Sequence, residues 1–233
     1  NYADSFANNI ARVAIPSDTF MVSDFGSKED TDLIQKAIDR VFKAGGGTLV
    51  LPQGDYTSSP IVLKSKINLH LEENSVIRFI PNPEKYPLAY NWFSGIPCMN
   101  YSPMIYARNC TDIKISGKGT IDGMGDNQAW KNMKVNERVD WGLLRDYDAR
   151  GIKEEERKFG QGHSLQPDLI TFIECSRVII SGVTIRNAPN WVVHTVLSNQ
   201  ITISNCSISS EGYYHIGIAL ESSENVLVDN VKI

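Results

Sequence analysis

The sequence has few cysteines, and its charges are nearly balanced. Its four cysteines lack the close C-x-x-C spacing that is typical of zinc sites and redox motifs. We therefore predict buried free thiols at all four positions, with Cys110 and Cys175 in one column of neighbouring coils. The other two are Cys98 and Cys206. Lysine and arginine number 23 against 27 acidic residues, a net charge of −4, which predicts no surface for nucleic acid.

The sequence also lacks a long apolar run. No stretch approaches the about 20 residues that a membrane-spanning helix needs, so no membrane span is predicted. No signal peptide opens the chain, which predicts a protein that is either cytosolic or already processed. With 233 residues, 42% of them apolar and 21% charged, the composition is that of one large globular domain.

Short β-branched strands take the place of long apolar runs. Similar segments begin at Val178, Ile201 and Val226, at intervals of 23 and 25 residues. A period of this size, built of short strands, is typical of stacked coils in a solenoid. We predict an all-β solenoid over residues 20–233, preceded by an N-terminal arm over residues 1–19. Five coil starts align, at Pro60-Ile61, Pro103-Met104, Pro167-Asp168, Asn190-Trp191 and His215-Ile216.

An amphipathic helix is predicted before the first coils. Apolar residues from Leu33 to Phe42 recur at helical spacing, and Asp30 and Asp32 place negative charge at the helix start. Three glycines at residues 45–47 allow the left-handed backbone at its end. Such a helix would cover the apolar cross-section of the first coil and shield its strand edges.

Two intervals between coil starts are too long for one coil and hold insertions, at about residues 81–102 and 124–166. Insertions in solenoids project on one face, often the binding face, although a solvated structural loop is the alternative.

Strand alternation separates inward columns from an outward row, where a binding groove is expected. The inward columns are Ile105, Ile170, Val193 and Ile218, and Ala107, Phe172, Thr195 and Leu220. The outward row is Tyr106, Thr171, His194 and Ala219.

Three stretches of the chain resemble glycoside hydrolase family 28, the polygalacturonases and their relatives. They read DFGSKEDTDLIQKAIDRVFKAGGGTLVLPQGDY, SPMIYARNCTDIKISGKGTIDG and PDLITFIECSRVIISGVTIRNAPNWVVHTV. The more specific parts are GKGTIDG and an N-x-P-x-W-x-x-H segment formed by Asn187, Pro189, Trp191 and His194. The resemblance extends from about Ser17 to the end of the chain.

The resemblance implies a right-handed parallel β-helix with a capping helix. It also implies a secreted or periplasmic protein that hydrolyses pectic polysaccharide, of galacturonan or rhamnogalacturonan type, without metal or other cofactor. The family inverts the anomeric carbon. Inversion requires one carboxylic acid and one carboxylate, about 6.5–9.5 Å apart.

The sequence departs from the family pattern where the catalytic acid should stand. The family's Asn-x-Asp-Gly motif falls at Tyr214-His215-Ile216-Gly217, where only the glycine matches. Ile216 cannot exchange a proton, and a further acid often found two residues after the glycine is Ala219. No aspartate lies between Asp168 and Asp229, so shifting the alignment does not restore the motif. The remaining motifs would follow Ile233, so we expect a truncated chain that needs further coils or a second chain.

Few residues remain as candidates for chemistry, and no catalytic residue or metal ligand is assigned. His194, Trp191, Tyr214 and His215 are predicted to bind substrate. The alternatives are a surface histidine that caps a strand row for His194 and core packing for Trp191. The nearest acids, Glu211 and Glu221, are expected to be solvated turn residues, and Asp122 a turn-capping residue.

Three functions follow, in descending order. The first is the N-terminal part of a polygalacturonase-like glycosidase, and the second is a non-catalytic β-helix that binds carbohydrate or has a structural role. The third is pectate-lyase-type β-elimination. That reaction usually requires calcium held by clustered carboxylates, and no such cluster is visible in the sequence.

Overall fold

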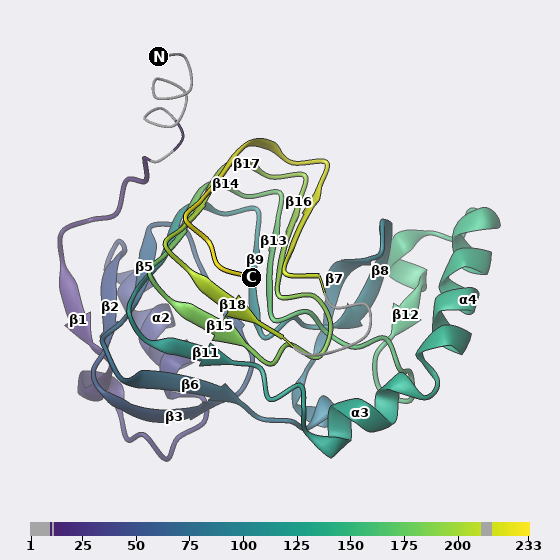
Figure 1. Ribbon diagram of the computed structural model, residues 1–233, viewed down its shortest axis with the longest axis horizontal. Helices are drawn as coiled ribbons and strands as arrows, with labels where there is room; N and C mark the ends of the chain where they lie inside the picture. The colour runs from purple at the N-terminus through teal and green to yellow at the C-terminus, as the bar shows by residue number, and fades with distance from the viewer. Residues whose placement is uncertain (1–9, 11, 211–215) are drawn as a thin grey trace.

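The computed structural model describes residues 10, 12–210 and 216–233 of the chain, which form a parallel β-helix (Figure 1). Three parallel sheets run along it. Sheet A contains Thr19–Met21 (β1), Gly47–Leu51 (β2), Ile67–Leu71 (β5), Thr111–Gly117 (β10), Ser176–Ser181 (β14), Asn199–Ser204 (β17) and Glu224–Asp229 (β20). Sheet B contains Gly54–Ser58 (β3), Ser75–Phe79 (β6), Thr120–Asp122 (β11), Thr184–Arg186 (β15) and Ser207–Ser209 (β18). Sheet C contains Ile61–Val62 (β4), Ile105–Arg108 (β9), Ile170–Ile173 (β13), Val193–Val196 (β16) and Ile218–Glu221 (β19).

The register between coils follows the sequence period. Val178 of β14 pairs with Ile201 of β17, which pairs with Val226 of β20, so the predicted coil repeat is confirmed. The boundary between the arm and the helix stays a prediction, because residues 1–9 and 11 lie outside the described part of the chain. The first strand, β1, already pairs with β2.

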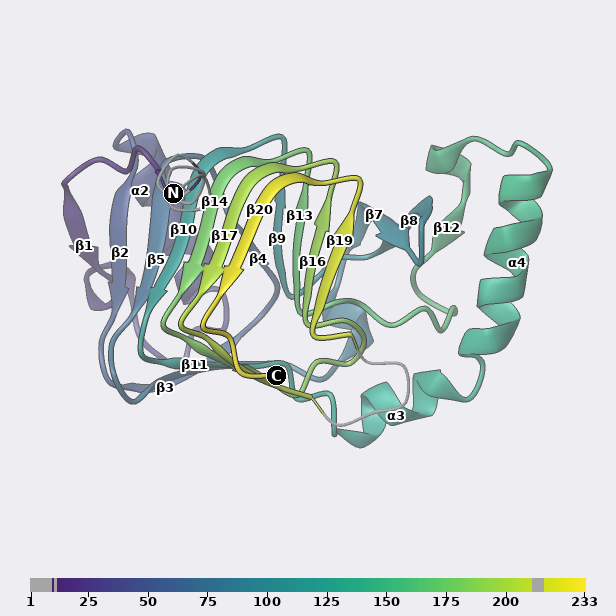
Figure 2. The same cartoon turned by 45° about the horizontal axis from the view of Figure 1, so that its top comes forward.

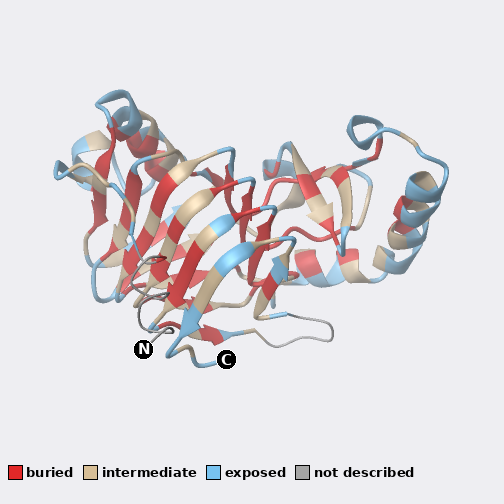
Figure 3. Cartoon of the chain, turned by 90° about the horizontal axis from the view of Figure 1, so that it is seen from above, coloured by how far each residue is buried: buried red, intermediate tan, exposed pale blue. Residues whose placement is uncertain are grey.

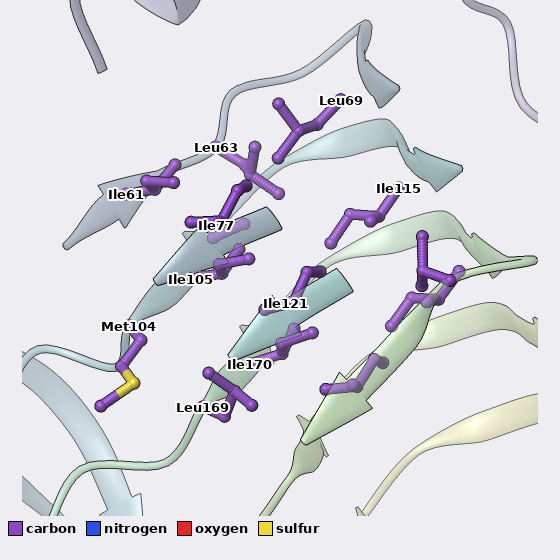
Figure 4. Close-up of a cluster of buried hydrophobic side chains, with 14 of the residues drawn as sticks. Ile61, Leu63, Leu69, Ile77, Met104, Ile105, Ile115, Ile121, Leu169 and Ile170 are labelled. Carbon is purple, nitrogen blue, oxygen red and sulfur yellow. The ribbon is translucent and has the colours of Figure 1, made fainter. Parts of the chain in front are cut away.

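The core consists of stacked aliphatic side chains from all three sheets. Leu69 and Ile115 of sheet A, Ile121 of sheet B and Ile105 and Ile170 of sheet C are fully buried and gather in one cluster (Figure 4). Six residues of the two predicted inward columns are buried: Ile105, Ile170, Val193, Ala107, Phe172 and Thr195. Ile218, which ends the first column, is half-buried and packs against the same core. Leu220 is 45% exposed, because β19 is an edge strand of sheet C in the described chain.

The predicted capping helix is α2, Leu33–Lys43, and it packs against β2, β4 and β5. Its buried face consists of Leu33, Ile34, Ala37, Ile38 and Val41. Phe42 does not belong to this face, contrary to the sequence prediction. It is 45% exposed, and the ammonium group of Lys64 lies 5.1 Å from the centre of its ring. After the helix, Gly46 has a φ of 103°, and a Cβ there would meet the backbone of Lys66, so the chain turns here only with glycine.

Both insertions form structure of their own on one side of the coils (Figure 2). The first contains the turn Pro83–Lys85 (η2) and an antiparallel hairpin of Leu88–Phe93 (β7) and Ile96–Tyr101 (β8). The second contains Gln128–Lys134 (α3), Glu137–Ala149 (α4), Glu154–Glu156 (η3) and Lys158–Phe159 (β12). The two are joined, because β12 pairs with β8. A further short turn, Val22–Phe25 (η1), precedes α2.

The cysteines agree with the sequence prediction. All four are free; Cys98, Cys175 and Cys206 are buried, and Cys110 is half-buried. Burial raises the pKa of Cys98 and that of Cys175 to about 12. None of the helices in the described ranges is long and apolar enough to cross a membrane.

Candidate functional site

Three ionisable residues, Asp168, His194 and Glu221, form a hydrogen-bonded network that links three successive coils. His194 lies in β16, and its side chain has no exposed surface. Its Nδ1 is 2.8 Å from Oδ2 of Asp168, and its Nε2 is 3.0 Å from Oε2 of Glu221. A histidine between two carboxylates donates at both ring nitrogens when it is protonated.

Asp168 is held from several sides by the coil that follows it. Its Oδ1 accepts hydrogen bonds from the side chain of Asn190, at 2.8 Å, and from the backbone of Trp191, at 3.2 Å. Stacking of the coil starts causes this arrangement, because Leu169 donates its backbone N–H to the carbonyl of Trp191. The carboxylate is 3% exposed and fully engaged, so it fixes the orientation of the His194 ring.

The surroundings of His194 favour its protonated form. Burial alone lowers the pKa of the imidazole, but the hydrogen bonds to Asp168 and Glu221 and the charges of these carboxylates outweigh burial and raise the pKa to about 9. At neutral pH the group is therefore an imidazolium between two acids.

A cleft of about 820 Å³ lies next to the hydrogen-bonded network of Asp168, His194 and Glu221. It is bounded by the hairpin turn, by the end of α3 and start of α4, and by the coils that carry Asn190 and Ile216. Two tryptophans line it, Trp141 from α4 and Trp191 from the coil. Apolar lining with a few polar groups is typical of a small-ligand site, and flat indole faces suit sugar rings.

The α3–α4 side of the cleft is cationic. Lys134 forms an ion pair with Glu137, with 2.9 Å between Nζ and Oε2. Arg138 is exposed at the cleft and has no ion-pair partner among the residues that the structure describes. One positive charge is therefore available here for an acidic ligand.

The predicted outward row does not form an open groove. Its strand positions are right, since Tyr106, Thr171, His194 and Ala219 pair in register, but all four residues are buried. The reason is the first insertion. Strand β7 packs Ala89, Tyr90 and Trp92 onto the outer face of sheet C, and the hydroxyl of Tyr106 donates to the carbonyl of Tyr90. Figure 3 shows buried segments, drawn in red, along the stacked strands of the coils.

The predicted substrate-binding residues separate into three groups. Trp191 lines the cleft and packs edge-on against the His194 ring, with 4.8 Å between ring centres. His194 lies beneath the surface rather than on it, because Asp168, Glu221 and Trp191 surround it; a direct contact with sugar stays a prediction. Tyr214 and His215 lie outside the described residues, as does Glu211.

Two acidic residues, Glu221 and Asp122, make contacts that the sequence did not predict. The side chain of Glu221 is only 22% exposed and binds His194, so it is not the solvated turn residue that the sequence suggested. Asp122 does cap its turn, through the backbone N–H of Met124, and it also accepts from Arg186 and Asn187.

Ile216, to which the sequence pattern assigns the family's catalytic aspartate position, lines the cleft and is 38% exposed. The cleft therefore has an apolar side chain here, and the assignment of the catalytic position stays a prediction. No cluster of three or more His, Cys, Asp or Glu side chains within residues 12–210 and 216–233 is arranged to hold a metal.

Sequence reasoning missed Asp168, Lys134, Arg138 and Trp141. A signal existed for Asp168, since it opens the coil directly below Asn190-Trp191 in the aligned starts. The other three lie in the second insertion, which has no period to align.

Comparison with known proteins identifies relatives of this fold, although no family model matches the chain. The chain is 26% identical to a probable polygalacturonase from Vitis vinifera over 79% of its length and 35% of that protein. It is also 26% identical to an exopolygalacturonase from Platanus acerifolia, over 91% of this chain and 55% of the relative. The crystal structure of a hyperthermoactive exopolygalacturonase from Thermotoga maritima matches with a TM-score of 0.90 and 35% identity, over 99% of this chain and 56% of that one.

The chain therefore has a polygalacturonase-like parallel β-helix fold. It spans between about a third and just over half the length of these relatives.

Proposed function

We propose that this protein is a pectin-degrading glycoside hydrolase of the polygalacturonase type, which binds galacturonan in the cleft between α4 and the coils. The observation that carries the proposal is the match to an exopolygalacturonase over 99% of the chain at a TM-score of 0.90. The chemistry of the cleft supports it. Trp141 and Trp191 offer stacking faces for sugar rings, and Arg138 offers a charge for a uronate carboxylate.

Inverting hydrolysis also requires a pair of carboxyl groups, and Ile216 supplies none at the family's position. The proposal therefore includes completion of the site by further coils or by a second chain. It also places the protein outside the cytoplasm, secreted or in the periplasm, where pectic polymers are found.

One observation favours a second function, a carbohydrate-binding β-helix without catalysis. Ile216 is an apolar residue in the cleft, at the position where a proton must be exchanged. Such a protein would bind galacturonan through the same aromatic and cationic side chains and leave the glycosidic bond intact.

One pair of measurements on the purified chain separates these functions. Calorimetry measures binding of a galacturonate trisaccharide, with the neutral galactose trisaccharide as the matched ligand. Reducing-sugar release from polygalacturonate measures hydrolysis. Preferred binding of the acidic trisaccharide with release of reducing ends supports the hydrolase. Binding without release supports the second function when it persists after the further coils or the second chain are supplied, and the absence of both binding and release contradicts each proposal. Unsaturated products would instead indicate β-elimination.

A further inference from the structure

One oxygen of the Glu221 carboxylate is held by His194, and the other has no hydrogen-bond partner among the residues that the structure describes. Oε2 accepts from the imidazole, while no hydrogen bond to Oε1 occurs within the described residues. The hairpin turn passes close to Oε1, since a Cβ built on Gly95 would lie 3.9 Å from it. The side chain is 22% exposed, so part of it is accessible from outside.

Residues next to the hydrogen-bonded network of Asp168, His194 and Glu221 line the cleft. Asn190, which donates to Asp168, and Trp191, which packs on His194, are both lining residues. Ser94, the residue before Gly95, lines it as well. Glu221 does not itself line the cleft, but it is adjacent to residues that do, through its bond to His194 and through the hairpin turn.

The groups behind Glu221 determine which ligand atoms suit it. His194 donates to the carboxylate from the interior, and Asp168 prevents the imidazole from turning away. A carboxylate oxygen fixed in this way accepts hydrogen bonds, and little rotamer freedom is lost when a ligand binds to it. Sugar hydroxyls are the matching donors, and a second carboxylate would be repelled.

We propose that Glu221 is a saccharide-binding residue whose free oxygen accepts hydrogen bonds from ring hydroxyls, and that His194 and Asp168 are the positioning residues that hold it. The inference rests on the proposed function, because it places the sugar in the same cleft. It adds an orientation: the hydroxyl edge of a uronate faces β19, and its carboxylate faces Arg138.

Three variants of the full chain test this proposal by calorimetry. Glu221→Gln keeps the shape and an oxygen for His194 but removes the charge, and we expect the dissociation constant for the galacturonate trisaccharide to rise about tenfold. Glu224→Gln, three residues further on exposed strand β20, is the matched control and should bind like the unchanged chain. Arg138→Gln should weaken only the acidic trisaccharide, whereas Glu221→Gln should weaken the acidic and the neutral trisaccharide by the same factor.

The positioning role requires a readout that a structural role would not affect. We expect the ring ¹⁵N signals of His194 to shift when the galacturonate trisaccharide is added to the unchanged chain, and to stay in place with the folded Glu221→Gln variant. Equal binding by Glu221→Gln and Glu224→Gln, or unchanged His194 signals at saturating ligand, overturns the inference and leaves the proposed function intact. Absence of binding by the unchanged chain overturns both.

Discussion

The imidazole of His194 and the carboxylate of Asp168 form a hydrogen-bonded pair inside the protein, with 2.8 Å between Nδ1 and Oδ2. Neither side chain is more than 3% exposed. The two residues belong to consecutive coils, so the pair ties one turn of the β-helix to the next at the edge of the cleft. The contribution of this pair to the free energy of unfolding can be measured directly.

The first prediction concerns stability against pH. Because the pKa of His194 is raised to about 9 in the folded chain, above the about 6.5 of an unfolded chain, its contribution is complete below pH 6.5. We expect about 3 kcal/mol of unfolding free energy to be lost between pH 6.5 and 9. Urea titrations at several pH values, with the difference taken between the unchanged chain and His194→Gln, isolate this contribution.

The control is His70→Gln, since His70 bonds to a serine hydroxyl and has no carboxylate partner among the described residues. If both histidine variants gave the same pH dependence as the unchanged chain, the pair would contribute nothing.

Loss of the Asp168 charge should destabilise the fold. In Asp168→Asn the amide group must face the donors of His194, Asn190 and Trp191, so at least one buried donor loses its acceptor. We expect about 3 kcal/mol less unfolding free energy, measured in urea at pH 7. Asp126→Asn changes an exposed aspartate and should alter stability by less than about 0.5 kcal/mol. A loss below about 1 kcal/mol in Asp168→Asn would contradict the burial and bonding described above.

The positive charge of Arg138 should account for the salt dependence of uronate binding. In the unchanged chain, affinity for the galacturonate trisaccharide should fall as sodium chloride is raised, because ions screen an exposed charge pair. Arg138→Gln should bind about fivefold more weakly at low salt and show a smaller salt effect. Lys131→Gln, an exposed lysine of α3 away from the cleft lining, is the control. A salt effect of equal size in all three proteins would refute this assignment.

Two glycine substitutions should have opposite effects. Gly117 has a φ of 111°, and a Cβ there would lie 1.9 Å from the carbonyl oxygen of Leu71 in the neighbouring coil. Gly117→Ala should therefore destabilise the chain by more than about 2 kcal/mol. Gly142 lies in α4 with open space around it, so Gly142→Ala should raise the unfolding free energy by up to about 1 kcal/mol. Thermal unfolding of both variants decides whether this difference exists.

The parts of the fold that repeat were predictable from sequence. In-register pairs such as Val178 with Ile201 follow from the coil spacing, and so does the capping helix with its buried Ile34 and Ile38. The burial of the outward row was not predictable. Strand alternation predicts which way Tyr106 points, but it does not predict that β7 folds back and covers the outer face of sheet C.

The candidate site shows the same limit. His194 and Trp191 stood out because they belong to a recognisable motif, and Ile216 because it departs from one. Glu221 was interpreted as a turn acid because its partner His194 lies 27 residues away in the sequence. Arg138 and Trp141 lie in a non-repeating insertion, so only the folded chain brings them next to Trp191.

The insertion that carries α3 and α4 leaves the coil repeat unchanged. Strand β11 before it pairs with β15, and β13 after it pairs with β9, as in any uninterrupted coil. One side of the cleft can therefore vary in length and charge without a change in the stacked coils. Exchange of this single segment would alter the lining of the cleft and leave the core of the β-helix intact.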